Sequence, residues 1–294
     1  MKTVILTGHK GFIGGQLYKK LKDEEYDVKG FEKDCTIEEI RECIEGLAQY
    51  KFEDTTIVHQ GANTDTLFED NSEMMRNNYD FSKQLFDLAL NFGINVVYAS
   101  SAAIYGTGKI KHPINVYGWS KAASETYGLL KFTDTNLTYP PRFVALRYFN
   151  VFGPGEEKKG KMASVAYQAM KKGSMELFPK KPRRDFVYVE DVVNANLHAI
   201  QNANVKTGVY DVGSGVSNTF EYLCRCLGIP YTITSEDKIP EGYQFLTKSK
   251  RSKWMPGWKP KYDLSLGLEI YKGYFQKKYD IEQEHITRKN EDYE

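Results

Sequence analysis

A glycine-rich turn near the N-terminus limits the possible folds of this chain more strongly than any other segment. The segment TGHKGFIG (residues 7–14) lies between an apolar run, Thr3–Thr7, and a helical pattern, Phe12–Glu24. In a strand–turn–helix unit such glycines permit a tight turn, close approach of a pyrophosphate and close packing of the helix on the sheet. Backbone amides at the start of the helix then face the anion. The segment therefore predicts a dinucleotide site formed by Gly8, Gly11, Phe12, Ile13 and Gly14.

The N-terminal half alternates apolar runs with helical patterns, which is typical of βαβ units and a parallel sheet. The apolar runs predict strands at residues 3–7, 26–32, 55–59, 95–101 and 143–148, and the helical patterns lie at 12–24, 74–92 and 117–132. Successive units of this kind predict an α/β protein with a Rossmann doubly wound parallel sheet and helices on both faces.

A smaller α/β substrate-binding domain is expected after residue 154, where the pattern becomes less regular. Helices are expected at 162–172, 192–201, 219–227 and 264–275, strands at 185–189 and 208–213, and a helix cap at 217–218. We assign residues 1–162 and about 187–214 to the dinucleotide-binding domain, and about 163–186 and 215–276 to the substrate domain. Residues 277–294 are mostly charged and are expected to form a solvated helix extension or a loose tail.

The composition argues against several classes of protein. The 294 residues are 41% hydrophobic and 27% charged, and their net charge of +1 lacks the basic excess of nucleic-acid-binding proteins. No apolar run approaches the roughly 18 residues of a membrane helix, and the opening run is too short for a signal peptide. Four cysteines without a Cys-x-x-Cys pair favour reduced thiols in a cytoplasmic protein. No His, Cys, Asp and Glu cluster has metal-ligand spacing, so no metal is expected.

Two neighbouring residues bear on which dinucleotide is bound. Glu32 ends the second predicted strand roughly 20 residues after Gly14, the distance expected for the acid that holds the adenosine ribose. Its carboxylate favours NAD, because it would repel the 2′-phosphate of NADP. Lys33 follows directly and would instead bind that phosphate. The choice between NAD and NADP, either of them tightly bound, therefore stays open.

A Tyr-x-x-x-Lys pair, Tyr117 and Lys121, lies in the predicted helix that follows the fourth strand. The four-residue spacing puts both side chains on one face of a helix, and the lysine ammonium would lower the pKa of the phenol. The pair then takes a proton from a substrate hydroxyl while hydride leaves the same carbon. Ser101 ends the preceding strand, at the sheet edge where ligands bind, and would hydrogen-bond the reacting hydroxyl.

Together these motifs resemble those of the extended short-chain dehydrogenase/reductases that modify nucleotide sugars, over about residues 3–275. The resemblance implies that the serine, tyrosine and lysine form a catalytic triad. It also implies that the cofactor is contacted by Gly61, Ala62 and Asn78, and by the tyrosine and the lysine as well. Asn150 and Arg184 fall in two further signatures of the family, RYFNVFGP (147–154) and RDFVYVEDV (184–192), and would hold the sugar diphosphate.

A narrower resemblance is to the members that invert C6 of a nucleotide-linked heptose for lipopolysaccharide synthesis. It is carried by NNYDFSK (77–83), NVYGWSK (115–121) and KGKMAS (159–164). It implies that Lys159 is a second base opposite Tyr117, that Lys161 and Tyr243 contact the substrate, and that the enzyme is a homo-oligomer. Two bases suit a reaction that oxidises a hydroxyl to a ketone and regenerates it on the other face, without net redox change.

Three alternatives stand beside this one. A UDP-glucose 4-epimerase, or another nucleotide-sugar epimerase or reductase, would share most motifs, and Gly155 stands where the heptose enzymes often have Arg. A 4,6-dehydratase would place an Asp-Glu pair directly after Ser101, where this chain has two alanines. A non-catalytic NAD(P)-binding regulator would lack the tyrosine or the lysine of the triad.

Overall fold

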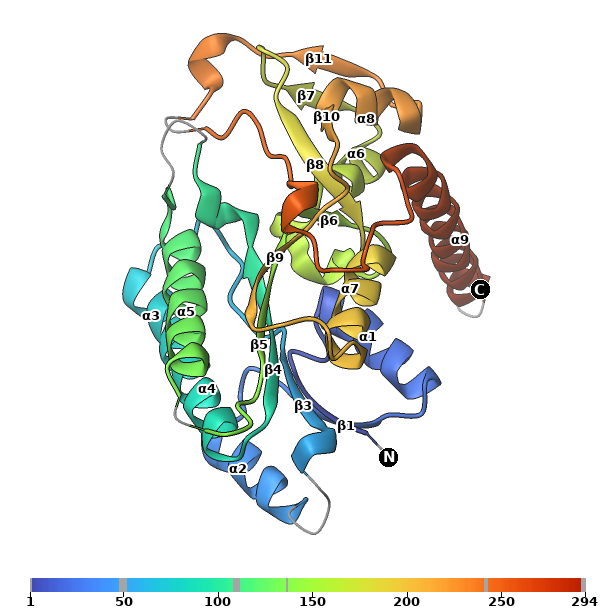
Figure 1. The fold of residues 1–294 in the computed structure, drawn as a ribbon. Helices are drawn as coiled ribbons and strands as arrows, with labels where there is room; N and C mark the ends of the chain where they lie inside the picture. The colour runs from blue at the N-terminus through green and yellow to red at the C-terminus, as the bar shows by residue number, and fades with distance from the viewer. Residues whose placement is uncertain (1, 48–51, 108–111, 136, 241–242, 292–294) are drawn as a thin grey trace.

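The computed structural model describes residues 2–47, 52–107, 112–135, 137–240 and 243–291, with the backbone alone for residues 53 and 281–291. Its main sheet has six parallel strands in the order β2-β1-β3-β4-β5-β9 (Figure 1). The strands are β1 (Thr3–Thr7), β2 (Asp27–Phe31), β3 (Thr55–His59), β4 (Asn95–Ser101), β5 (Phe143–Tyr148) and β9 (Gly208–Val212). The order reverses direction between β1 and β3, which is the switch point of a doubly wound sheet, so the predicted fold class is confirmed.

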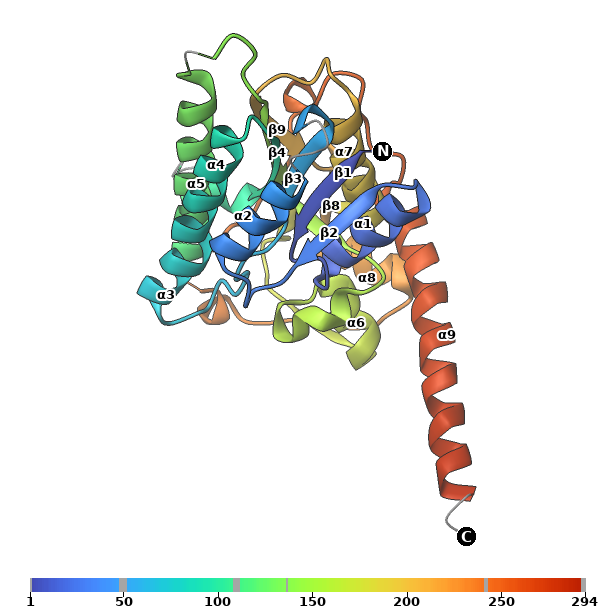
Figure 2. The ribbon, with the colours of Figure 1, turned by 90° about the horizontal axis from the view of Figure 1, so that it is seen from below.

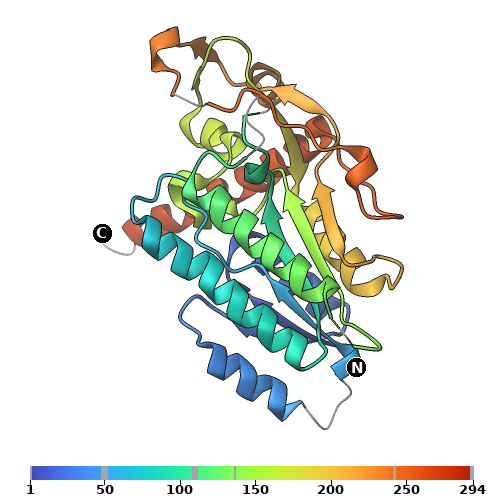
Figure 3. The same cartoon turned by 60° about the vertical axis from the view of Figure 1, so that its left-hand side comes forward.

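Helices cover both faces of this sheet. On one face lie α1 (Phe12–Asp23) and α7 (Val189–Gln201), and on the other lie α2 (Ile37–Gly46), α4 (Phe81–Asn91) and α5 (Val116–Thr133) (Figures 2 and 3). The strand β1 is buried at every position, with an apolar centre, because it faces both layers. Val4 and Leu6 pack into the core under α1 and α7, whereas Ile5 packs into the core under α2 and α4, and all three are fully buried.

A smaller part of the chain lies beyond the carboxyl ends of the strands (Figure 1). It contains a sheet in the order β10-β8-β6, a two-stranded pair β11-β7, and three helices. Their bounds are β6 (Asn150–Phe152), β7 (Met175–Leu177), β8 (Arg183–Tyr188), β10 (Ser217–Thr219), β11 (Tyr231–Ile233), α6 (Val165–Lys172), α8 (Phe220–Leu227) and α9 (Leu264–Glu291). Phe152, Phe186 and Leu268 share the core of this part. The domain boundaries from the sequence stay a prediction, and β6 pairs with β8 although it falls in the first range.

Several local features differ from the pattern in the sequence. The helix predicted at 74–92 is α3 (Asn71–Met75), a π-helical turn (Arg76–Asp80) and α4 in succession. The charged segment after residue 155 forms a 3-10 helix (Glu156–Met162), and the helix expected from residue 162 starts at Val165. Thr219 caps α8, because its hydroxyl accepts the N–H of Tyr222, so the expected cap at 217–218 is wrong. Further 3-10 turns are Phe52–Asp54, Ala102–Tyr105, Glu236–Lys238 and Arg251–Lys253.

The C-terminal charged segment continues α9 as far as Glu291 (Figure 2). Of the two structures expected for this segment, a helix extension or a loose tail, the helix extension is therefore correct up to that residue. Residues 292–294 of the predicted tail lie outside the described residues.

Over the part of the chain that the structure describes, no helix combines the length and the apolar character needed to cross a membrane.

Candidate active site

A cleft of about 1710 Å³ opens between the carboxyl ends of the main strands and the smaller sheet. Ligand sites for one small molecule usually occupy roughly 300–1,000 Å³, so this cleft has room for two ligands side by side. The predicted site residues that line it are Gly8, Gly11, Phe12, Ile13, Gly14, Glu32, Lys33, Gly61, Ala62, Ser101, Tyr117, Lys121, Asn150, Lys159, Lys161, Arg184 and Tyr243. Asn78, the remaining predicted residue, lies behind the cleft wall.

The glycine-rich turn has the geometry of a dinucleotide cradle. Gly8 has a φ of +70°, and a Cβ there would lie 2.8 Å from the Cα of Gly61. A Cβ on Gly14 would lie 2.0 Å from the carbonyl oxygen of Gly8, so only glycine lets α1 start this close to the turn. Gly11 is the N-cap of α1, and no side chain caps the free amides of the first turn. These amides, next to Phe12 and Ile13 in the cleft wall, fit the pyrophosphate of NAD or NADP.

The end of β2 completes the expected cofactor site. Glu32 lines the cleft, and its Oε1 accepts the backbone N–H of Lys10 at 2.6 Å. Its carboxylate also lies 3.1 Å from Nδ1 of His9. Lys33 lines the same end of the cleft, so both residues weighed in the sequence reach the place where the ribose would bind.

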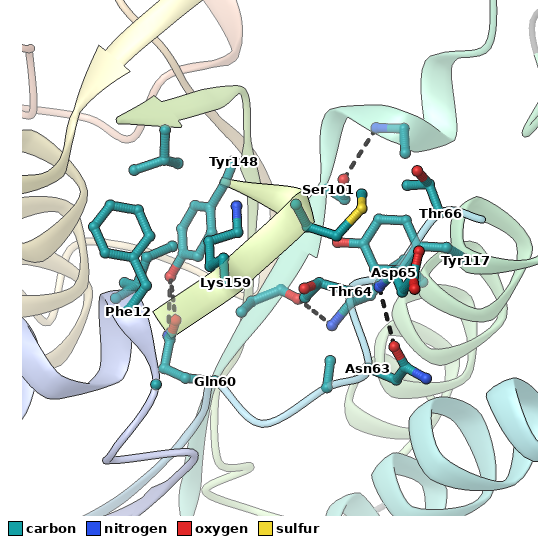
Figure 4. Close-up of a pocket in the computed structure, with 18 of the residues that line it drawn as sticks. Phe12, Gln60, Asn63, Thr64, Asp65, Thr66, Ser101, Tyr117, Tyr148 and Lys159 are labelled. Carbon is teal, nitrogen blue, oxygen red and sulfur yellow. Dashed lines mark hydrogen bonds between the residues drawn. The ribbon is translucent and has the colours of Figure 1, made fainter. Parts of the chain in front are cut away.

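The structure brings Ser101 and Tyr117 together. Figure 4 shows Ser101, at the end of β4, beside the ring of Tyr117, which lies in the first turn of α5. Asn115 caps this turn, because its side chain accepts the N–H of Gly118 at 2.8 Å. Burial raises the pKa of Tyr117 above its ordinary value, and a hydrogen bond with Ser101 partly offsets that rise by lowering the pKa.

Lys121 lies one helical turn further along α5 and is almost fully buried. Its Nζ donates to the carbonyl oxygen of Ala99 at 2.9 Å and lies 4.9 Å from the ring centroid of Tyr98. Burial lowers the pKa of Lys121 to about 7. The expectation of a lowered pKa for Tyr117 is wrong for this structure: burial raises the tyrosine pKa, and the one group that lowers it is Ser101, not Lys121.

Lys159 faces Tyr117 across the cleft. Figure 4 shows it on the side of Phe12 and Tyr148, with Ser101 and Tyr117 on the opposite side. Its Nζ lies 5.8 Å from the ring centroid of Phe12, and burial lowers its pKa from the ordinary lysine value. The side chain thus belongs to the cleft and not to a solvated charge run.

The polypeptide around Lys159 is tied to three other elements. Gln16 of α1 donates to the carbonyl of Pro154 at 2.9 Å, and Lys158 donates to the carbonyl of Lys10 at 3.0 Å. Lys278 of α9 contacts Glu157 at 2.6 Å. These contacts fix the 3-10 helix against both the cofactor turn and the smaller part of the molecule.

The predicted diphosphate end is formed by the smaller part. Arg184 is buried with its guanidinium 5.2 Å from the ring centroid of Tyr243 and 5.5 Å from that of Phe220. Asn150 accepts the hydroxyl of Thr247 at 3.1 Å. Of the basic cluster at residues 180–184, all of it described, Arg184 alone lines the cleft.

Asn78 positions other residues. Its Oδ1 accepts the N–H of Asn63 at 2.8 Å, and its Nδ2 donates to Oγ of Ser120 at 3.0 Å. It therefore connects the segment after β3 to α5, behind Tyr117. It is buried in the π-helical turn, and such turns are frequent near functional sites.

Sequence reasoning missed several cleft residues in the segment after β3. Thr64, Asp65 and Thr66 line the cleft (Figure 4). There was a reason in the sequence to expect these residues there: they follow the predicted strand β3, and ligands bind at the edge where parallel strands end.

The structure shows no metal-binding group of His, Cys, Asp and Glu among its described residues.

Comparison with known proteins defines the class of this protein. The family model described as the NAD dependent epimerase/dehydratase family matches residues 4–213, so the chain belongs to that family. The predicted class, an NAD-dependent nucleotide-sugar epimerase and hence an isomerase, is confirmed.

Among individual relatives, the ADP-L-glycero-D-manno-heptose-6-epimerase of Pseudomonas aeruginosa is 36% identical over 252 residues, which are 74% of this chain and 75% of the relative. The crystal structure of the Helicobacter pylori ADP-L-glycero-D-manno-heptose-6-epimerase is 27% identical, with a TM-score of 0.76 and coverage of 94% and 96%. The Thermotoga maritima UDP-glucose 4-epimerase, solved with UDP-glucose, is 25% identical, with a TM-score of 0.77 and coverage of 94% and 99%.

Proposed function

We propose that this chain inverts C6 of ADP-glycero-D-manno-heptose, converting the D-glycero into the L-glycero form through transient oxidation. The observation that carries the proposal is the placement of Tyr117 and Lys159 on opposite sides of one cleft (Figure 4). Oxidation takes a proton from the C6 oxygen and a hydride from C6, and reduction returns both to the opposite face of the ketone, so proton-transfer groups are needed on opposite sides of the cleft. The relatives named as 6-epimerases support the choice of C6.

Bound NAD or NADP supplies the hydride acceptor and donor. Tyr117 takes the hydroxyl proton in one orientation of the sugar, and its hydrogen bond with Ser101 stabilises the phenolate. Lys121 holds the adjacent backbone through Ala99 and adds positive charge when protonated. Lys159, on the other side of the cleft and with its pKa lowered by burial, serves the opposite orientation. The sugar has the same oxidation state before and after the reaction, so the cofactor is not consumed.

The remaining predicted site residues fit the substrate. Arg184 and Lys161 place positive charge in the wall of the cleft, where a diphosphate would bind, and Asn150 and Tyr243 add polar contacts. The nucleotide end would therefore lie in the smaller part and the sugar next to the triad. We further propose a homo-oligomer in the cytoplasm, with neither nucleic acid nor membrane as a partner.

The proposal is tested with a panel of ADP-, UDP-, GDP- and CDP-sugars, followed by NMR of the sugar protons. We expect inversion at C6 of ADP-D-glycero-D-manno-heptose without net NADH. Inversion of UDP-glucose at C4, with no reaction of the ADP-heptose, would instead establish the alternative that the Thermotoga maritima structure favours. A dehydrated product would point to a dehydratase, and no turnover of any sugar would support a regulator.

A further inference from the structure

The glycine-rich turn carries a histidine for which the dinucleotide motif has no role. The ring of His9 lies between the turn, α1 and β2, with its centroid 5.5 Å from that of Tyr18. Its Nδ1 lies 3.1 Å from Oε1 of Glu32 and 3.3 Å from the carbonyl oxygen of Phe31. Both neighbours are acceptors, so Nδ1 carries a hydrogen and donates it to them.

These contacts fix one oxygen of Glu32 and leave the other for a ligand. Oε1 receives His9 and the backbone N–H of Lys10, the latter at 2.6 Å. Within the described residues, no hydrogen bond reaches Oε2. The Glu32 side chain lines the cleft, whereas His9 does not. The histidine therefore touches the ribose end of the site only through the carboxylate.

Gly30 of β2 makes room for the imidazole. A Cβ at Gly30 would lie 2.6 Å from Cγ of His9 and 2.8 Å from its Nδ1 and Cδ2. These are ring atoms next to the backbone, and such a contact forces the ring to move. The imidazole of His9 fits only because residue 30 is glycine. A methyl group at position 30 would displace the ring and disturb its hydrogen bond with Glu32.

We infer, on the basis of the proposed function, that His9 is a positioning residue for the adenosine ribose of the cofactor. It holds Glu32 so that Oε2 accepts a ribose hydroxyl, and in this way it sets the preference for NAD over NADP. A carboxylate fixed at this place also repels a 2′-phosphate, whereas a carboxylate free to swing away discriminates less. Gly30 is required for the same preference because it admits the ring.

The test measures dissociation constants of NAD and NADP by calorimetry on cofactor-free protein. His9→Phe keeps the ring and removes the donor, and Gly30→Ala displaces the ring. A hydrogen bond to a charged group corresponds to about a tenfold change in affinity. We expect each variant to weaken NAD about tenfold and NADP less than twofold. Gly46→Ala is the control, because a Cβ there meets nothing within 4 Å. Circular dichroism establishes that each variant is folded.

A double-mutant cycle separates positioning from a general disturbance of the turn. In the Glu32→Gln background, His9→Phe should change the NAD dissociation constant less than twofold. A tenfold loss that persists there, an equal loss for both dinucleotides, or an affinity within twofold of the native protein would overturn the inference. These are binding measurements without sugar, so failure of the epimerase proposal would appear separately, as absent turnover by the native protein.

Discussion

Tyr117 and Lys159 both lie at the cleft, and burial shifts their pKa values in opposite directions. Burial raises the pKa of Tyr117, which holds its proton at neutral pH, whereas burial lowers the pKa of Lys159. Each group donates a proton in one protonation state and accepts one in the other. The two roles exchange according to which face of the sugar is presented, so both directions of an epimerisation are served.

Substitution of the tyrosine should abolish catalysis without loss of fold. Tyr117→Phe keeps the ring and removes the group that exchanges the proton, so kcat should fall at least about a hundredfold. Tyr127→Phe is the matched control on the same helix, since its hydroxyl donates to Asp87 at 2.6 Å and its side chain does not line the cleft. Steady-state kinetics and bound-cofactor content measure the effects, and a Tyr117→Phe enzyme of near-native rate removes the tyrosine from the mechanism.

The lysine opposite should be equally necessary. Lys159→Met keeps most of the length and removes the amine, so epimerisation should fall at least about a hundredfold while cofactor binding is retained. Lys172→Met, at the exposed end of α6, is the control and should change kcat less than about fivefold, because its side chain is exposed and does not line the cleft. If Lys159→Met stays within threefold of the native rate, the second base lies elsewhere.

At the scale of elements, the 3-10 helix that carries Lys159 depends on one buried carboxylate. Glu156 is fully buried, and its oxygens accept the backbone N–H of Gly153 at 3.2 Å and both the N–H and the hydroxyl of Ser164, at 2.5 and 2.8 Å. It therefore joins the start of this helix to the start of α6. This charged segment is therefore a fixed part of the cleft wall.

Removal of that carboxylate should loosen the segment. Glu156→Ala leaves two buried N–H groups without a partner, so the free energy of unfolding should fall by about 1–3 kcal/mol, and kcat should fall because Lys159 is no longer held. Glu157→Ala is the adjacent control: it removes a half-exposed ion pair with Lys278, worth at most about 1 kcal/mol. Urea unfolding and kinetics measure both, and equal effects of the two variants would contradict this account.

The strands and helices of the main sheet were predictable because each is marked by a hydrophobic pattern within its own segment of the sequence. Strands such as β5 are apolar at nearly every position, and the glycines of the first turn have one structural reason each. The cap at Thr219 is local, but Ser217, Asn218 and Thr219 are all residue types that cap helices, so the sequence alone does not select among them.

The π-helical turn around Asn78 was not predictable, since Asn78 is held by contacts with distant segments. The same holds for His9: only the structure places Gly30 and Glu32 beside it.

For the whole molecule, buried basic groups predict an unusual dependence of stability on pH. The pKa of Lys121 is about 7 in the folded protein and 10.5 unfolded, so between these values the unfolded chain binds more protons. Stability of the cofactor-free protein should therefore rise with pH, by on the order of 1–2 kcal/mol from pH 7 to pH 9. His59, with a pKa lowered to about 3, acts in the same direction between pH 3 and its ordinary 6.5.

Urea denaturation at pH 7 and pH 9 tests this dependence, with Lys121→Met as the comparison. The variant lacks the titrating amine, so most of the rise should disappear, leaving the smaller part due to Lys159. An unchanged rise in the variant would show that other groups cause it.

The account as a whole claims that the hydrogen removed from C6 returns to C6. The direct measurement is NMR and mass spectrometry of the product formed from ADP-D-glycero-D-manno-heptose with deuterium at C6. Because the hydride stays with the bound cofactor between the two steps, the account predicts the L-glycero product with its deuterium retained and no net NADH. Loss of the deuterium to solvent, or an absence of C6 inversion while another carbon of a nucleotide sugar is inverted, would contradict it.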